Sequence, residues 1–425
     1  MPDRTITPAI KDAVEFNLKL KPCERYALKS GTNVYALSAG AEEVIMLEFV
    51  FYAGSCYDPQ KLVASSTNYL IKNGTSKKTA FQVNEHFEYY GAYLNRACSN
   101  ETATITLHCL SKHLEELLPV VREILEDAVF PEEELEIFKQ NSKQRLSVNL
   151  QKCDFVANRL IDAYLYGEDH PYGAYSTHQD YDALNADLLR SFYKDHYSKG
   201  KAILFAAGKL PPNFEALLNK YFGDLLLNES VQYPANQAVP TREKKHRINN
   251  DTNGVQGAIR MARSFPNRHH PDFQKAMVLN NLFGGFFGSR LMANIREDKG
   301  YTYGIQSYVQ NHIQQTGWLI STEADKDVCE DTIKEVYKEM ALLREELVDD
   351  DELLLVKNYM MGTNLGDLDG PFHIIARWKN LVINALDEQY FYNSMNAIKT
   401  VTAEEIKILA NKYLVPEDFF ELVVI

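Results

Sequence analysis

The sequence lacks any apolar run long enough to cross a bilayer. The longest candidate, Val44 to Gly54, is interrupted by Glu48, whereas a membrane-spanning helix needs about 20 predominantly apolar residues. The first thirty residues carry charges at intervals and contain no apolar core of the signal-peptide type. We therefore expect a soluble, cytoplasmic protein with no membrane partner, or a periplasmic one if an export signal has been removed.

Cysteine motifs and strongly basic patches are also missing. The six cysteines show no C-x-x-C spacing, so we expect reduced, mostly buried thiols rather than disulfides or a metal site. The formal net charge is -13 at pH 7, which repels a phosphate backbone. The most basic run, Arg242 to Arg247, contains Glu243 and lies between two structured regions. These features argue against a nucleic-acid partner.

What the chain does contain is an internal repeat. PEEELEIFKQN (131–141) resembles DDDELLLVKNY (349–359) at a shift of 218 positions, and NADLLRSFYKDHY (185–197) resembles TAEEIKILANKYL (402–414) at a shift of 217. Such agreement between distant segments is hard to obtain by chance. With 425 residues, 45% of them hydrophobic and 24% charged, the chain has a globular composition and favours two or three domains.

Local patterns predict matching elements in the two halves. Apolar residues recur at helical spacing over residues 114–125 and again over 333–343. Residues 102–109 alternate between polar and apolar side chains, which is typical of a half-buried strand. Asn185 and Thr402 are good helix N-caps, and Thr402 makes a capping box with Glu405.

These patterns predict an α+β fold of two homologous domains, each a mostly antiparallel sheet with helices packed on one face. The first domain is predicted over residues 1–226 and the second over residues 246–425. Residues 227–245 are polar and contain two prolines, so we predict that they form the linker.

Three stretches resemble the insulinase and mitochondrial processing peptidase family of zinc peptidases, the inverzincins. Residues 168–208, which include the landmark His170-Pro-Tyr-Gly, resemble the stretch after the active-site helices of that family. Residues 91–109 resemble its strand pair beside the cleft, and residues 284–304 resemble its second-half signature. The resemblance covers nearly the whole chain, and the doubled domain predicted above is the family's architecture.

The family holds zinc with an H-x-x-E-H helix and one distant glutamate. Two histidines at i and i+4 bind one ion, and the glutamate between them polarises the attacking water. Here the corresponding stretch is ASSTNYLIKNGT (64–75), which puts Ser65 and Tyr69 at the ligand positions and Asn68 at the general-base position. The resemblance puts Arg145 at the third ligand position, or Gln144 after a slip of one residue.

None of these residue types suits the chemistry of a zinc peptidase. Hydroxyl and amide groups are poor zinc ligands, an asparagine cannot accept a proton from water, and a guanidinium repels the ion. The histidines form no H-x-x-x-H or H-x-H pair, and neither His269-His270 nor His108 with His113 can share one helical face. We therefore expect that this chain binds no zinc.

The second half retains residues that the family uses opposite the zinc. There an arginine and a tyrosine seven residues later bind the substrate carbonyl and stabilise the oxyanion. IREDKGYTY supplies Arg296 and Tyr303 at this separation, whereas Tyr301 has the wrong spacing. A guanidinium and a phenol can donate hydrogen bonds where negative charge develops. The alternative is that Arg296 is a surface helix residue and Tyr303 an ordinary strand aromatic.

Other positions have weaker assignments. Asn95 lies where the family often has an asparagine beside the cleft, although the next residues depart from its pattern. The glycines of LFGGFFGSRL, at Gly284, Gly285 and Gly288, form either a turn between helices or a loop near bound peptide. Cys98 lacks a nearby histidine base, so we interpret it as a buried thiol.

The resemblance, together with the eroded ligands, suggests a non-catalytic subunit of a two-chain zinc-dependent peptidase. A zinc-bearing homologous subunit would form a heterodimer with this chain, which would close the chamber around unfolded peptides and contribute Arg296 and Tyr303. The chain alone is expected to be inactive. The alternative is a purely structural or peptide-binding scaffold of the same fold. A metal-independent hydrolase using Ser65 or Cys98 would lack both a base and an oxyanion hole.

Overall fold

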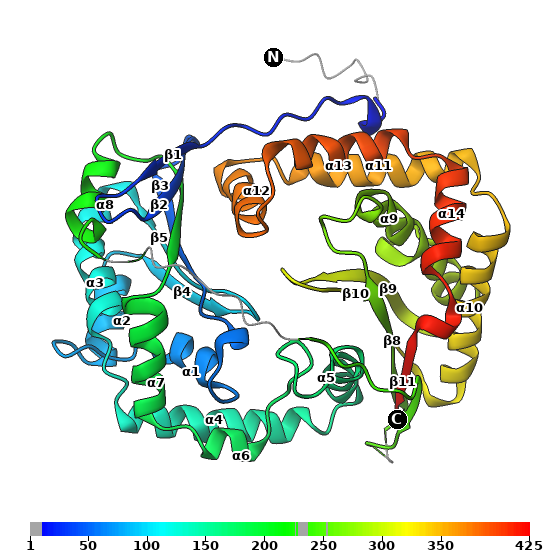
Figure 1. Cartoon of the computed structure of the whole chain (residues 1–425), viewed down its shortest axis with the longest axis horizontal. Helices are drawn as coiled ribbons and strands as arrows, with labels where there is room; N and C mark the ends of the chain where they lie inside the picture. The colour runs from blue at the N-terminus through cyan, green and yellow to red at the C-terminus, as the bar shows by residue number, and fades with distance from the viewer. Residues whose placement is uncertain (1–10, 226, 228–236, 252–253) are drawn as a thin grey trace, which may run out of the picture.

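The chain folds into two halves, each built on one sheet (Figure 1). The computed structural model describes residues 11–225, 227, 237–251 and 254–425. The sheet of the first half has the spatial order β1 (Glu24–Ala27), β2 (Asn33–Ser38), β6 (Ala202–Gly208), β3 (Val44–Phe51), β5 (Ala103–Leu110) and β4 (Tyr93–Cys98). Neighbouring strands are antiparallel except β2 and β6.

The second sheet repeats this plan with one strand fewer. Its order is β7 (Lys245–Ile248), β11 (Phe420–Val424), β8 (Gln256–Phe265), β10 (Thr316–Asp325) and β9 (Thr302–Asn311). Only the pair of β7 and β11 is parallel. The predicted α+β fold with two mostly antiparallel sheets is therefore confirmed.

Helices follow in the same succession in both halves. The first half carries α1 (Val63–Leu70), α2 (Ala80–Tyr89), α3 (Leu114–Asp127), α4 (Glu132–Asn149), α5 (Cys153–Tyr166), α6 (His178–Asp182), α7 (Ala186–Tyr193) and α8 (Phe214–Phe222). The second half carries α9 (Phe273–Asn280), two π-helical segments η5 (Asn281–Gly285) and η6 (Met292–Asp298), α10 (Cys329–Glu345), α11 (Asp350–Gly366), α12 (Pro371–Ile383), α13 (Glu388–Thr400) and α14 (Ala403–Tyr413). No helix in the described part of the chain has the length and apolar character that crossing a membrane requires.

The internal repeat is visible in the positions of these elements. α4 and α11 start 218 positions apart, α7 and α14 start 217 apart, and β6 and β11 start 218 apart. The predicted caps are confirmed, because Asn185 accepts a hydrogen bond from the Leu188 N–H and Thr402 forms a capping box with Glu405. The same local signals therefore shape both halves.

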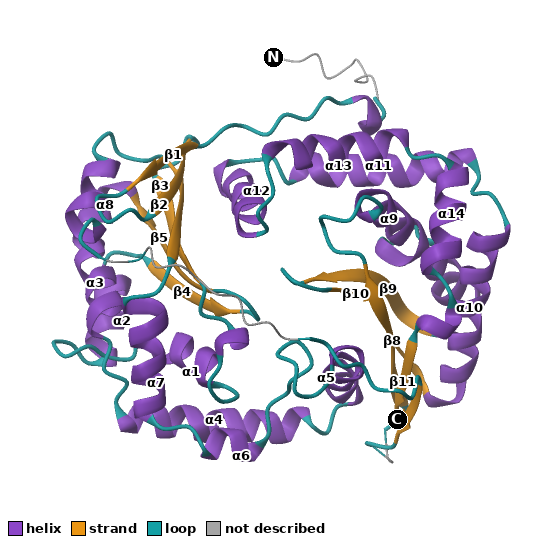
Figure 2. Ribbon diagram, viewed as in Figure 1, coloured by secondary structure: helices purple, strands orange, loops and turns teal. Residues whose placement is uncertain are grey.

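One helix of each half packs on the sheet of the other half. α5 contacts β8 and β11 of the second sheet, and its repeat partner α12 contacts β6 and β2 of the first sheet. Each sheet thus has its own helices on one face and the borrowed helix on the other (Figure 2). The prediction placed helices on one face of each sheet and did not foresee this exchange.

The exchange explains why β6 is apolar without interruption. Leu204 and Ala206 pack in the core of the first half, whereas Phe205 and Ala207 belong to the core shared with the second half. A strand that is buried on both faces needs apolar side chains at successive positions. Across the same contact, the Nζ of Lys379 on α12 lies 2.8 Å from a carboxylate oxygen of Glu48, which is buried on β3.

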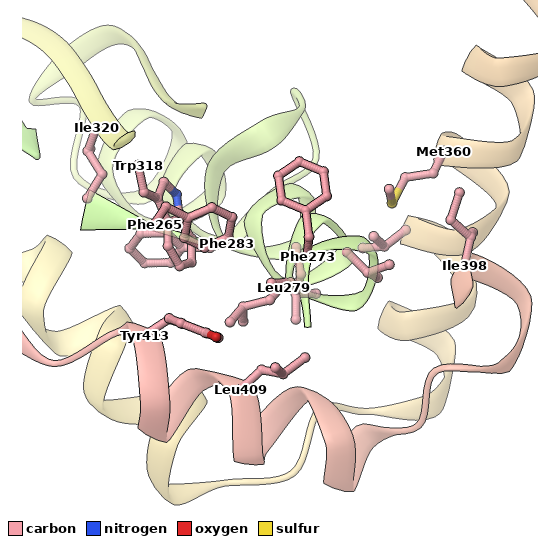
Figure 3. Close-up of a cluster of buried hydrophobic side chains, with 14 of the residues drawn as sticks. Phe265, Phe273, Leu279, Phe283, Trp318, Ile320, Met360, Ile398, Leu409 and Tyr413 are labelled. Carbon is pink, nitrogen blue, oxygen red and sulfur yellow. The ribbon is translucent and has the colours of Figure 1, made fainter. Parts of the chain in front are cut away.

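Aromatic residues form the centre of the second half (Figure 3). Trp318 on β10 is fully buried, and the centroid of its ring system lies 5.0 Å from that of Phe265 in an edge-to-face arrangement. Within the predicted linker, residues 227–245, residues 228–236 lie outside the described residues, as does the predicted boundary at residue 226. The two halves are therefore defined here by their sheets.

Candidate functional site

α1 is the helix that the sequence analysis predicts to correspond to the zinc helix of the resembled family. Ser65 and Tyr69 lie four residues apart on its exposed face, as residues at i and i+4 must. Asn68 lies on the opposite, buried face and is 3% exposed. Its side-chain amide donates hydrogen bonds of 3.2 Å to the Thr104 carbonyl and to the Tyr197 hydroxyl. At the predicted general-base position this chain therefore has a core amide that joins α1 to the sheet.

Tyr69 is held in place by aromatic and cationic neighbours. Its ring centroid lies 4.9 Å from that of Phe138 on α4, and the guanidinium carbon of Arg96 on β4 lies 5.2 Å from it. Arg96 also donates a hydrogen bond to the Tyr69 backbone carbonyl. Where the resembled family has a metal ligand, this chain packs a phenol between an aromatic ring and a cation.

A pocket of about 760 Å³ opens between α1 and α4, and it gathers the other degenerate positions. Ser65, Tyr69, Gln144 and Arg145 all line it. Among its lining residues Glu134 is the only carboxylate, and it accepts a hydrogen bond of 2.7 Å from the Asn73 amide.

The donors in this pocket do not fit a zinc ion. They are a hydroxyl, a phenol, amides and a guanidinium, with one carboxylate already engaged by an amide. Across all of the described residues, no group of three or more histidine, cysteine, aspartate or glutamate side chains is placed to hold a metal ion. Residues 64–75 and α4 thus form a pocket without the donor set of a zinc peptidase.

Arg296 and Tyr303 lie in the second half and line no part of this pocket. The guanidinium carbon of Arg296, on η6, lies 4.5 Å from the ring centroid of Phe287 and 5.5 Å from that of Tyr303, on β9. Tyr303 is 94% exposed and Phe287 is 63% exposed. Within the described ranges Arg296 has no carboxylate partner. Arg296 is half-buried and Tyr303 is exposed, and no hydrogen bond to another described residue occupies their donor groups.

The remaining predicted positions are spread over both halves. Asn95 is exposed on β4, which is the edge strand of the first sheet. Gly284 is buried, and a Cβ atom there would lie 2.7 Å from the Cβ of Ser307, so close packing on β9 requires glycine. Gly285 is half-buried and Gly288 is exposed. A peptide-binding role for these positions stays a prediction.

The hydrolase alternative gains no support from Cys98. The thiol is half-buried, and burial, with a smaller contribution from Asp58, raises its pKa to about 12. A thiol with so high a pKa is almost fully protonated at neutral pH and is a weak nucleophile.

Two residues of the site escaped the sequence analysis. Phe287 lies in the glycine-rich stretch, where only the glycines were considered, and an exposed phenylalanine seldom has a sequence signal of its own. Arg96 was noted only as a departure from the family pattern. Its spacing from Tyr69 along the chain does not reveal that β4 lies beside α1.

Comparisons with known proteins agree with this architecture. The insulinase (peptidase family M16) profile matches residues 36–170, and the profile described as the peptidase M16 inactive domain matches residues 183–360. An uncharacterized zinc protease, YmxG, of Bacillus subtilis is 22% identical over 93% of this chain and 96% of its own length. The beta subunit of the mitochondrial processing peptidase of Caenorhabditis elegans is 23% identical over 64% of this chain and 62% of its own length.

Solved structures show the same fold. A peptidase M16 inactive domain from Pseudomonas fluorescens superposes with a TM-score of 0.85 at 22% identity, covering 95% of this chain and 98% of the other. A protease from Helicobacter pylori gives a TM-score of 0.84 at 15% identity, covering 96% of this chain and all of the other.

Proposed function

Because the chain belongs to the M16 (insulinase) peptidase family, we propose that it is the non-catalytic subunit of a two-chain zinc-dependent peptidase. A homologous subunit carries the zinc helix, and this chain closes the chamber around an unfolded peptide. Arg296 and Tyr303 then bind the substrate carbonyl and stabilise the oxyanion that forms when the partner's water attacks. Without that partner the chain is inactive.

One contrast within the chain carries this proposal. The pocket at α1 lacks the donor set of a zinc site, whereas the half-buried arginine and the exposed tyrosine of the second half have no hydrogen-bond partner among the described residues. A purely structural subunit has no need for an uncompensated guanidinium beside a phenol that is 94% exposed. Donors fixed where negative charge develops are what acyl-transfer chemistry requires.

The test compares the chain alone with the chain co-purified with a zinc-bearing M16 relative. Metal analysis and cleavage of a quenched fluorescent peptide are measured for both preparations. We expect no zinc and no cleavage for the chain alone, and both for the pair. Loss of one oxyanion donor lowers kcat by about 100-fold or more, so Arg296→Ala and Tyr303→Phe in this chain should each reduce the pair's activity strongly.

Lys299→Ala is a matched control, since Lys299 is an exposed cation immediately after η6. If the pair keeps full activity with Arg296→Ala and also with Tyr303→Phe, these residues make no catalytic contribution, and the scaffold alternative is favoured. Stoichiometric zinc at Ser65 and Tyr69, or cleavage by the chain alone, would contradict the proposal altogether.

A further inference from the structure

Arg268 is a half-buried cation that forms no ion pair with a carboxylate among the described residues, although Glu101 is close enough to act on its charge. It lies in the loop between β8 and α9, and burial lowers its pKa. Two other arginines of this half do form ion pairs, since Arg260 pairs with Glu323 at 2.6 Å and Arg290 with Glu352 at 2.8 Å. For Arg268 the one hydrogen bond within the described ranges goes to the side-chain oxygen of Asn380. A half-buried guanidinium with unused donors favours an anionic ligand.

This guanidinium lies where two cavities meet. The smaller cavity, of about 240 Å³, and the larger one, of about 830 Å³, share Arg268, Gln274 and Tyr390 as lining residues. The larger cavity is polar and open to solvent, whereas the smaller one continues inward between α9, α11, α12 and α13. A ligand can therefore enter through the larger cavity and place one end in the smaller one.

The inner part of the smaller cavity is apolar. Phe273, Met360 and Ile398 lie near one another between α9, α11 and α13 (Figure 3), and all three are buried. Leu381 and Met395 complete the apolar wall. Methionine side chains adapt to ligands of varied shape. The cavity can therefore accommodate apolar side chains of different shapes.

Two polar features select the rest of the ligand. Asn311, at the end of β9, lines the same cavity, and its buried side-chain oxygen has no hydrogen-bond donor among the described residues. The other charged residue of the lining, Arg377, is already paired with Asp367. No carboxylate belongs to the described lining of the smaller cavity. The site thus offers a guanidinium for a carboxylate and an amide oxygen for an N–H group.

We infer that this cavity binds the carboxylate end of an N-acylated apolar amino acid, as found at the C-terminus of a peptide. The carboxylate pairs with Arg268, the adjacent N–H donates to Asn311, and the apolar side chain fills the space beside Met360 and Ile398. The inference depends on the proposed function only for the source of the ligand, because binding itself requires neither zinc nor a partner subunit.

The experiment measures binding to the purified full chain alone, by fluorescence anisotropy of labelled peptides. We compare a peptide that ends in leucine with its C-terminal amide and with a peptide that ends in aspartate. A hydrogen bond between two charged groups changes affinity by about 10-fold or more. The free acid ending in leucine should therefore bind at least about 10-fold more tightly than either of the others.

Arg268→Gln should remove the preference for the free acid and leave the affinity for the amide unchanged. Lys334→Gln is the matched control, because it removes one exposed cation from α10 on the same half. Thermal unfolding checks that Arg268→Gln is folded. The comparison of acid with amide on the unaltered chain needs no variant at all.

Competition with N-acetyl-leucine distinguishes the two sources of the ligand. Equal affinity for N-acetyl-leucine and for the peptide supports the site and assigns it to a small carboxylate, whereas tighter peptide binding assigns it to a peptide terminus. Equal binding of acid and amide, or full acid binding by Arg268→Gln, would overturn the inference. Neither result would affect the proposed function, which is judged by cleavage with a partner.

Discussion

The guanidinium carbon of Arg296 lies 5.5 Å from the ring centroid of Tyr303 and closer still, at 4.5 Å, to that of Phe287. The arginine is thus supported by an aromatic face while its hydrogen-bond donors remain available. A cation–π contact at an exposed site stabilises by about 0.5–1 kcal/mol. Phe287 therefore acts as a positioning residue for Arg296.

The first prediction follows from this arrangement. Phe287→Ala should lower kcat/KM of the proposed two-chain peptidase by about 2- to 5-fold, because the arginine samples more orientations without the ring. Phe287→Tyr keeps the aromatic face and should retain activity. The measurement is steady-state peptide cleavage by the reconstituted pair. A Phe287→Ala loss as large as that of Arg296→Ala would mean that the ring itself contacts substrate.

A second prediction concerns the two faces of α1. Asn68→Ala should lower the free energy of unfolding by about 1–3 kcal/mol, since it deletes a buried amide that bonds to Thr104 and Tyr197. Ser65→Ala, on the exposed face of the same helix, should change it by less than about 0.5 kcal/mol. Urea titration of both variants provides the measurement. Equal destabilisation by the two substitutions would contradict the assignment of Asn68 to the core.

A third prediction tests the contact between the halves. Lys379→Met leaves the buried Glu48 carboxylate without its cation, and we expect a loss of about 3 kcal/mol in the free energy of unfolding. Adding Glu48→Leu to this variant should recover most of the loss, because an apolar pair avoids the buried charge. Denaturant unfolding of the single and double variants is the measurement. A double variant as unstable as Lys379→Met would show that the charge is not the cause.

The fourth prediction is a pH dependence. Burial raises the pKa of Asp162 on α5 from its ordinary value of 3.8 to about 7, although Gln310 acts in the opposite direction. The folded state therefore holds this proton more strongly than the unfolded state does. The stability that the protonated group contributes is fully present below about pH 4 and is lost as the pH rises to about 7.

Asp162→Asn should remove this dependence. The variant should exceed the unaltered chain in free energy of unfolding at pH 8, by about 1 kcal/mol or more, and differ little from it near pH 4. Asp154→Asn, an exposed position on the same helix, is the control. Urea titrations at both pH values give the answer, and an advantage of Asp162→Asn that is equal at pH 4 and pH 8 would exclude titration as its origin.

Periodicity, caps and the repeat were sufficient to predict the fold class and the two similar halves. The alternation at residues 102–109 gave β5, and the N-caps at Asn185 and Thr402 fixed the starts of α7 and α14. These signals lie within a few residues of the element that they determine, so they can be recognised in a single sequence. Because of the repeat, a helix or strand predicted in one half also predicted the equivalent element in the other half.

The helix exchange could not be predicted in the same way. The amphipathic pattern of α5 shows that one face is buried but not which sheet covers it, because both sheets offer similar apolar surfaces. The position of Arg96 beside Tyr69 likewise depends on how β4 lies against α1. The gathering of Ser65, Tyr69 and Arg145 in one pocket was predictable only because the family resemblance supplied the helix pairing.

The packing of α5 and α12 on the sheets of the opposite halves has a consequence for how such a chain can arise. The two helices occupy equivalent positions in the repeat. A polypeptide of half the length would therefore expose one apolar face of its sheet and leave one helix without a sheet to pack on. Two copies of that short polypeptide could each pack this helix on the sheet of the other copy, as in a domain-swapped dimer. Fusion of duplicated genes would then have kept this reciprocal helix packing within a single chain. If the linker is cut, the two fragments should fold only when both are present.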